Sequence, residues 1–167
     1  MAKPRRLPEV CVAYLVRDGA AGPEVLLGRK LSGLGLGKVV APGGKLEAGE
    51  SPVDAAVREV REEAGITVDP SSLELLGALT YLFPSKPEWS QVSWAFRARG
   101  DFGVPVASDE IDASWISINE VPLDEMWDDA KYWLSDLLRG EPVVATFEFG
   151  PDLSTVSARH YPGNNPV

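Results

Sequence analysis

The chain has 167 residues, of which 44% are hydrophobic and 25% are charged, so it is long enough for one globular domain and too short for two of ordinary size. Its formal net charge of −9 argues against a nucleic acid polymer as the main partner, because binding to DNA or RNA depends on Lys and Arg neutralising phosphates. A small phosphorylated ligand is compatible with this charge, since a bound cation can offset it.

The single cysteine and the absence of long apolar runs indicate the compartment. Cys11 has no partner for an internal disulfide, and its neighbours Val10 and Val12 favour a buried, inert thiol. No run reaches transmembrane length, and the basic start at 1–9 is not followed by the apolar segment of a signal peptide. We expect a cytoplasmic monomer without a membrane partner.

One domain is expected at 9–156, between flexible ends at 1–8 and 157–167 that are rich in Pro, Arg, Gly and Asn. Its first half is predicted to contain, in chain order, strands at 10–16 and 24–28, a glycine-punctuated loop at 32–38 and an extended piece at 39–41.

The first helix is predicted to begin after Ser51 and to end at Gly65. Ser51 can cap it, Pro52 suits its first turn, and Asp54 favours its positive end. Apolar residues recur inside it at helical spacing, namely Val53, Ala56, Val57 and Val60.

The second half is predicted to contain strands at 73–83, 91–99 and 115–118, a helix at 123–138 and a closing strand at 143–149. Strands interleaved with two helices predict a mixed central sheet covered on both faces, an α/β/α sandwich.

Five acidic residues surround the first helix: Glu47, Glu50, Glu59, Glu62 and Glu63. Two like charges about 4 Å apart repel by about 4 kcal/mol at an effective dielectric of about 20. Glu62 and Glu63 lie three and four positions after Glu59 and share a helical face with it, and carboxylate oxygens are ligands that Mg²⁺ and Mn²⁺ prefer. The pattern fits either a solvated acidic face or a divalent-metal site for displacement at phosphorus.

Arg58 and two glycines favour the metal site. Arg58 lies one step round the helix from Glu59 and can hold Glu50 through a charge-assisted hydrogen bond, which would fix the loop against the helix. Gly43 and Gly44 would let backbone atoms approach a metal or a phosphate, because no side chain intervenes.

The same stretch carries a nine-position pattern: Gly, five residues, Glu, seven residues, then Arg-Glu-aliphatic-x-Glu-Glu-x-Gly-aliphatic. The matching residues are Gly44, Glu50, Arg58, Glu59, Val60, Glu62, Glu63, Gly65 and Ile66. A chance match is on the order of 10⁻¹⁰ per starting position. The pattern resembles the signature of the Nudix hydrolases, which implies an α/β/α sandwich and divalent-metal hydrolysis of a nucleoside diphosphate linked to another group.

The resemblance implies roles for these residues by position. Glu59, Glu62 and Glu63 would be metal ligands, one of which also orients or deprotonates the attacking water, and Glu50 and Arg58 would support them. Glu59 and Glu63 are the preferred first ligands because they lie one helical turn apart. The expected cofactor is Mg²⁺, with Mn²⁺ as an alternative, and the Gly43 backbone is a further candidate ligand.

Segments outside the signature resemble the animal-type MutT branch, which hydrolyses oxidised purine nucleoside triphosphates such as 8-oxo-dGTP to monophosphate and pyrophosphate. They are VLLGRK at 25–30, the glycine-rich loop, PGGK at 42–45, SDEI at 108–111 and PLDEMWDDAKYW at 122–133. The resemblance implies that Glu110 is an additional metal ligand, with an exposed loop acid as the alternative, and that Lys30 lies near the phosphates. Further substrate-binding candidates are Leu34, Val40, Gly43, Gly44 and Lys45.

For the nucleotide base, the resemblance implies a stacking wall at Trp127, whereas Trp133 fits a core position equally well. Asp129 matches the first of two aspartates that read the purine edge. The second aspartate falls on Ala130, and an asparagine that reads the base falls on Val40. Missing hydrogen-bond partners weaken discrimination between bases more than they weaken affinity.

The leading hypothesis is therefore a metal-dependent nucleoside triphosphate pyrophosphohydrolase in nucleotide-pool sanitation. The first alternative is a Nudix hydrolase of dinucleoside polyphosphates or other nucleoside diphosphate compounds. A non-catalytic nucleotide-sensing domain is disfavoured by the intact signature.

Overall fold

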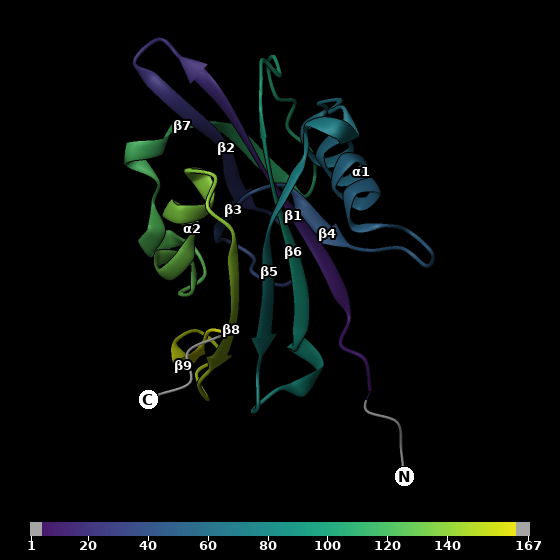
Figure 1. Cartoon of the computed structure of the whole chain (residues 1–167), viewed down its shortest axis with the longest axis vertical. Coiled ribbons are helices and arrows are strands. Elements are labelled where there is room, and N and C mark those ends of the chain that lie inside the picture. Colours follow the sequence, from purple (N-terminus) through teal and green to yellow (C-terminus); the bar gives the residue numbers. More distant parts are fainter. Residues whose placement is uncertain (1–4, 163–167) are drawn as a thin grey trace.

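The computed structural model describes residues 5–162, which form one mixed nine-stranded sheet with a helix on each face (Figure 1). The strands are β1 (Glu9–Gly19), β2 (Gly22–Lys30), β3 (Val39–Val40), β4 (Gly43–Lys45), β5 (Glu74–Leu82), β6 (Gln91–Arg99), β7 (Ile111–Ser117), β8 (Val143–Phe149) and β9 (Val156–His160). The helices are α1 (Pro52–Ala64) and α2 (Ala130–Leu138). Short 3-10 turns lie at Pro70–Ser72, Pro87–Trp89, Ile118–Glu120 and Leu123–Glu125.

The sheet follows the order β3-β2-β1-β6-β5-β8-β9, with β4 paired to β1 and β7 paired to β2. The pairs β1–β6 and β5–β8 are parallel and the others are antiparallel. β1 changes its antiparallel partner along its length, from β4 (Cys11 opposite Gly44) to β2 (Val16 opposite Val25). This pairing brings the glycines of β4 beside the centre of the sheet.

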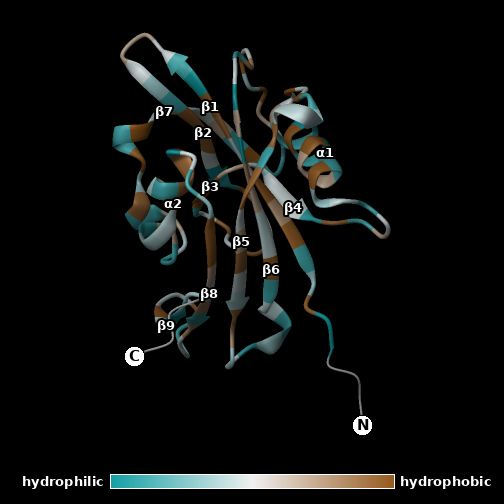
Figure 2. Ribbon diagram, viewed as in Figure 1, coloured by the Kyte–Doolittle hydropathy of each residue, from teal (hydrophilic) through white to brown (hydrophobic). Residues whose placement is uncertain are grey.

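Alternation along β1 divides the core into two layers, because successive side chains of a strand point to opposite faces. Tyr14 and Val16 pack with α2, whereas Ala13 and Leu15 pack with α1. Figure 2 shows hydrophobic residues running along the central strands between the two helices. The predicted α/β/α sandwich with a mixed sheet is confirmed.

The first helix has the predicted ends. The Ser51 hydroxyl accepts a hydrogen bond from the Asp54 N–H at 3.2 Å, and Pro52 opens α1. Gly65 has a left-handed φ of 67°, and its N–H donates to the Arg61 carbonyl at 3.0 Å. A residue without a side chain is favoured there. These caps fix where α1 begins and ends, and therefore where its acidic side chains lie.

The second helix is shorter than predicted. Residues 123–125 form a 3-10 turn, Met126 is extended (φ −96°, ψ 174°), and α2 begins only at Ala130. An apolar stripe in this segment is nevertheless buried and consists of Met126, Ala130, Trp133, Leu134 and Leu137. The spacing of this stripe fits a helix, but the helix itself begins only at Ala130.

The C-terminal boundary also differs from the prediction. Residues 156–160 form β9, which pairs with β8, and the Asp128 carboxylate accepts a hydrogen bond from the Val156 N–H at 2.9 Å. The expected flexible tail is therefore wrong for 157–160, because strand pairing holds this segment. Residues 1–4 and 163–167 of the expected flexible ends lie outside the described residues. No helix among those described is long and apolar enough to cross a membrane.

Candidate active site

Three carboxylates meet where α1 approaches the start of β7. Oxygens of Glu59, Glu63 and Glu110, here called the carboxylate trio, lie within 4.8 Å of one another. Glu59 and Glu63 are 8% and 6% exposed, whereas Glu110 is exposed. The Leu31 N–H donates to the Glu110 carbonyl at 2.9 Å and so ties the loop before β7 to the end of β2. The sandwich thus brings together residues that are 47 to 51 positions apart in sequence.

The surroundings of Glu59 and Glu63 oppose negative charge on these two carboxyl groups. Burial, and after it the hydrogen bond with Glu110, raise the pKa of Glu63 to about 8. The Gly43 N–H, which donates to Glu63 Oε2 at 3.1 Å, acts in the opposite direction. Burial also raises the pKa of Glu59. Buried carboxylates that repel one another and offer hard oxygen ligands fit a divalent cation.

Glycines make room for these carboxylates. A Cβ atom on Gly44 would lie 2.5 Å from Glu59 Oε1, and a Cβ atom on Gly43 would collide with the Cys11 carbonyl across the β1–β4 pair. Gly43 and Gly44 belong to β4. Their place in the sheet leaves the backbone open toward the trio, and the Gly43 N–H donates to Glu63.

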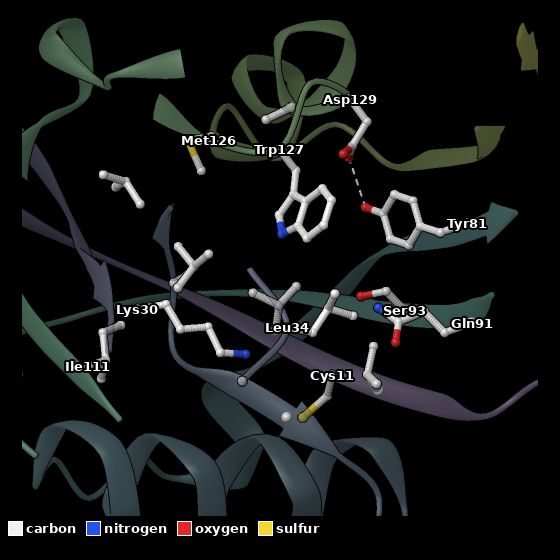
Figure 3. A pocket seen from close by; sticks show the side chains of 18 of the residues that line it. Cys11, Lys30, Leu34, Tyr81, Gln91, Ser93, Ile111, Met126, Trp127 and Asp129 are labelled. Carbon is white, nitrogen blue, oxygen red and sulfur yellow. Dashed lines mark hydrogen bonds between the residues drawn. The ribbon is translucent and has the colours of Figure 1, made fainter. Parts of the chain in front are cut away.

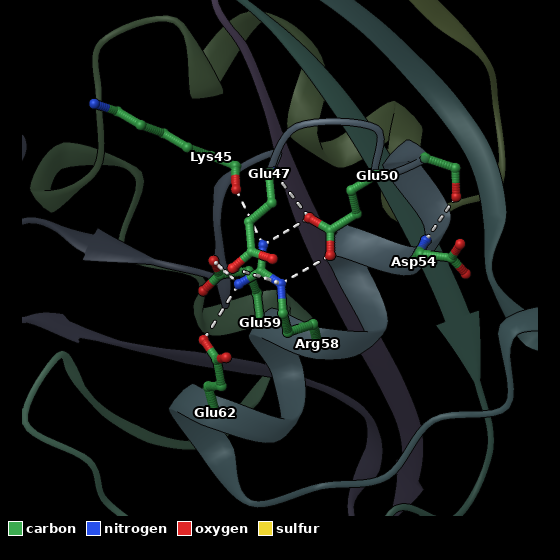
Figure 4. A network of polar contacts seen from close by, with 8 residues as sticks. Lys45, Glu47, Glu50, Asp54, Arg58, Glu59 and Glu62 are labelled. Atoms are coloured by element: carbon green, nitrogen blue, oxygen red, sulfur yellow. Dashed lines mark hydrogen bonds and ion pairs between the residues drawn. The ribbon is translucent and has the colours of Figure 1, made fainter.

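Arg58 joins the loop before α1 to the helix (Figure 4). Its Nε and Nη2 donate to both oxygens of Glu50 at 2.8 Å, and Nη2 also donates to the Lys45 carbonyl at 3.1 Å. Its Nη1 donates to Glu59 Oε1 at 2.8 Å. The hydrogen bond from Arg58 lowers the pKa of Glu50 to about 2. The predicted contact between Arg58 and Glu50 is present, and it also orients a member of the trio.

The two remaining acidic residues lie outside the trio. The Glu62 side chain is 55% exposed, and its Oε2 accepts a hydrogen bond from Arg58 Nη1 at 3.3 Å. Glu47 lies in the preceding loop, with Oε1 3.7 Å from Arg58 Nε. The structure therefore brings Glu59 and Glu63 together with Glu110, and directs Glu62 toward Arg58.

A cavity of about 240 Å³, here called the aromatic cavity, opens beside the trio (Figure 3). Glu63 and Glu110 line it, and so do the aromatic side chains of Tyr81, Phe83 and Trp127. All the predicted substrate-binding residues line this cavity: Lys30, Leu34, Val40, Gly43, Gly44, Lys45, Trp127 and Asp129. Carboxylates and aromatic side chains thus border one continuous site.

Trp127 stands in the wall of the aromatic cavity. Its ring makes edge contacts with Phe83 and Phe149, with centroids 6.1 and 5.8 Å apart, and Lys38 Nζ lies 4.8 Å from its centroid. Trp133, by contrast, is only 4% exposed and packs in the core against Tyr14. Trp127 thus presents more surface to a ligand than Trp133 does.

Asp129 is held at the base of this wall. It is 2% exposed, and its Oδ2 accepts hydrogen bonds from Tyr81 Oη at 2.9 Å and from Trp133 Nε1 at 2.7 Å. Burial raises the pKa of Asp129 to about 6. The neighbouring Asp128 bonds instead to Lys131 and to the Val156 backbone. It therefore gives the cavity no second carboxylate to replace the one missing at Ala130.

Four residues of the cavity that carry polar groups were not identified from the sequence: Tyr14, Tyr81, Gln91 and Ser93. Gln91 and Ser93 are two positions apart in β6 and share a face with the buried Ala95. Polar residues at alternate positions of an apolar strand face were the signal available in the sequence. This signal does not show that the face borders a cavity.

Comparison with known proteins finds relatives of this chain in both sequence and structure. The NUDIX domain family model matches residues 6–137. Oxidized purine nucleoside triphosphate hydrolases from Mus musculus and Danio rerio are 35% and 38% identical to the chain, over 75% of the chain and 79% of each relative. The crystal structure of a MutT protein from Bacillus halodurans has a TM-score of 0.77 and 29% identity, and covers 95% of this chain and 100% of that one.

The Bacillus halodurans protein shares the fold of this chain as well as part of its sequence. The match to the family model extends from the start of β1 to the last turn of α2 and includes every member of the carboxylate trio. The chain belongs to the Nudix hydrolase family.

Proposed function

We propose that this chain hydrolyses a nucleoside triphosphate to a nucleoside monophosphate and pyrophosphate, and that it requires Mg²⁺ or Mn²⁺. The observation that supports this most strongly is that carboxylates and an aromatic side chain line one cavity. Glu63, Glu110 and Trp127 all line it, so that a metal-bound phosphate chain and a stacked base can be held at once.

The trio would hold the metal through Glu59, Glu63 and Glu110, with Glu62 and the Gly43 backbone as further candidates. A bound divalent cation supplies charge neutralisation at the phosphate groups. A carboxylate of the trio accepts the proton that the attacking water loses. The water oxygen forms a bond to phosphorus, and the α–β anhydride bond breaks with its electron pair on the bridging oxygen.

Other residues position the substrate. Lys30 lines the same cavity as Glu63 and Glu110, and its ammonium group can bind a phosphate oxygen. Trp127 provides the surface on which the base stacks. Arg58 keeps Glu59 oriented through the hydrogen bond described above.

The base that we propose first is an oxidised purine, as in 8-oxo-dGTP, with sanitation of the nucleotide pool as the role. Its support is the name of the mouse and zebrafish relatives, oxidized purine nucleoside triphosphate hydrolase. Val40 and Ala130 have no polar side chains with which to read a base. The choice of base is therefore tested by comparing normal and oxidised nucleotides directly.

A substrate panel tests the proposal. Purified protein is given normal and oxidised nucleoside triphosphates, dinucleoside polyphosphates and nucleotide sugars with Mg²⁺ and then Mn²⁺, and the products are separated by chromatography. We expect monophosphate and pyrophosphate from triphosphates. Rapid cleavage of a dinucleoside polyphosphate with poor turnover of every triphosphate would instead support the alternative substrate class.

A further inference from the structure

Two polar side chains of β6 face the aromatic cavity. Gln91 and Ser93 both line it, and they alternate with Val92, which points to the opposite face of the sheet. Ser93 is a buried residue, only 5% exposed. Figure 3 shows both side chains rising from the sheet toward the cavity that Trp127 enters from the other side.

Neither side chain is engaged elsewhere in the protein. Among residues 5–162, no hydrogen bond is formed by the Gln91 carboxamide or the Ser93 hydroxyl, and Figure 3 shows no bond between them. Tyr81, which is opposite Gln91 in the β5–β6 pair, uses its hydroxyl to bind Asp129. A polar group next to a buried cavity loses its water when a ligand enters, and it then needs a partner on that ligand.

The cavity has few other ways to read a base. Glu63 and Glu110 belong to the carboxylate trio, and Oδ2 of Asp129 already accepts two hydrogen bonds. Val40 and Ala130 occupy the positions at which the family resemblance implies polar contacts to the base. Their side chains cannot form hydrogen bonds.

We propose that Gln91 and Ser93 determine base specificity by hydrogen-bonding the polar edge of the substrate base. This inference rests on the proposed function, in which the cavity holds a nucleotide. The carboxamide and the hydroxyl each donate and accept, so they match a base edge on which a donor lies beside an acceptor, as on the Watson–Crick edge of a purine. Both groups are uncharged, so their contribution to discrimination does not depend on pH near neutrality.

Binding of nucleoside monophosphates, measured by isothermal titration calorimetry, tests this separately from catalysis. The panel comprises AMP, GMP, CMP, UMP and 8-oxo-dGMP, with inorganic pyrophosphate and Mg²⁺ as a ligand that has no base. The variants are Gln91→Met and Ser93→Ala. Thr80→Val is the matched control, because it removes a hydroxyl from the neighbouring strand at a position that does not line the cavity.

We expect the wild type to prefer one base, and each β6 variant to bind that nucleotide about 10- to 100-fold more weakly, since a buried partner is left unpaired. The weakest-bound nucleotide and pyrophosphate should be bound as before, and Thr80→Val should match the wild type. Unchanged pyrophosphate binding and an unchanged melting temperature show that a variant is folded.

Three results would overturn the inference: equal affinity of the wild type for all bases, variants that keep the wild-type preference, or an equal loss for every nucleotide and for pyrophosphate. Hydrolysis of triphosphates by the wild type is scored in its own assay. If triphosphates are cleaved while the variants keep the wild-type preference, this inference fails and the proposed function stands. If the variants lose the preference while no triphosphate is cleaved, this inference stands and the proposed hydrolysis of triphosphates fails.

Discussion

Two buried carboxyl groups of the site differ in how their charge is balanced. Asp129 accepts hydrogen bonds from Tyr81 and Trp133, which stabilise its ionised form within the protein. Glu63 accepts the Gly43 N–H and faces the carboxyl groups of Glu59 and Glu110. Like charges in a buried position destabilise one another. The hydrogen bonds to Asp129 therefore offset part of the cost of burying its charge, whereas Glu63 calls for a cation.

Asp129 gives a prediction about stability and pH. Its pKa is raised from 3.8 to about 6 in the folded protein by burial, so between these values the folded state binds a proton that the unfolded state has lost. The free energy of unfolding should therefore fall as pH rises through this window, by at most about 1.4 kcal/mol per pH unit, and level off above it.

Asp129→Asn removes this titration. Urea unfolding of both proteins between about pH 5 and pH 7.5, away from the sequence pI of 4.6, should show the variant gaining stability relative to the wild type up to about pH 6. A difference that is constant across the range would contradict the buried, titrating carboxyl group.

At the scale of elements, the site depends on the close approach of β4 to α1. The sequence predicted α1 well because its signals are local: a serine cap, an early proline and a terminal glycine act within a few residues. It also predicted that Arg58 holds Glu50. Which of the helix carboxylates converge depends instead on distant chain segments, and the structure directs Glu62 to Arg58 and brings Glu110 to Glu63.

The same distinction explains what the sequence did not predict around α2. The apolar stripe from Met126 to Leu137 has helical spacing, but the helix begins only at Ala130. Asp129, just before it, accepts hydrogen bonds from Tyr81 and Trp133. Likewise β9 is specified by its pairing with β8, which is not visible in its own short sequence. Gln91 and Ser93 become site residues only through the cavity that the sheet forms with this segment.

Gly44→Ala tests the approach of β4 to α1. The added Cβ would lie 2.5 Å from Glu59 Oε1, so the Glu59 carboxylate must move while the core stays intact. We expect turnover to fall about 10-fold or more, with a change in melting temperature of only a few degrees. Steady-state kinetics and thermal unfolding provide the two measurements.

Gly150→Ala is the matched control, because its Cβ would meet neighbours only at ordinary contact distances of 3.7 Å or more. Full activity of Gly44→Ala would mean that Glu59 need not occupy its observed position.

At the scale of the whole molecule, a cation bound by the trio should stabilise the fold. A ligand that binds only the folded state adds about 2.7 kcal/mol at a concentration 100 times its dissociation constant. We therefore expect Mg²⁺ or Mn²⁺ to raise the melting temperature and a chelator to reverse this. Glu63→Gln should reduce the shift, whereas Glu120→Gln, an exposed glutamate outside the site, should keep it. An equal shift in both variants would place the cation elsewhere.

The most direct test of the central claim is the rate of pyrophosphate release from the best triphosphate as a function of Mg²⁺ concentration, for the wild type, Glu63→Gln and Glu120→Gln. We predict that the wild type and Glu120→Gln release no pyrophosphate in chelator and become active as Mg²⁺ is added, while Glu63→Gln stays at least about 100-fold slower. Undiminished release in chelator, or wild-type turnover by Glu63→Gln, would contradict a metal-dependent reaction at the carboxylate trio.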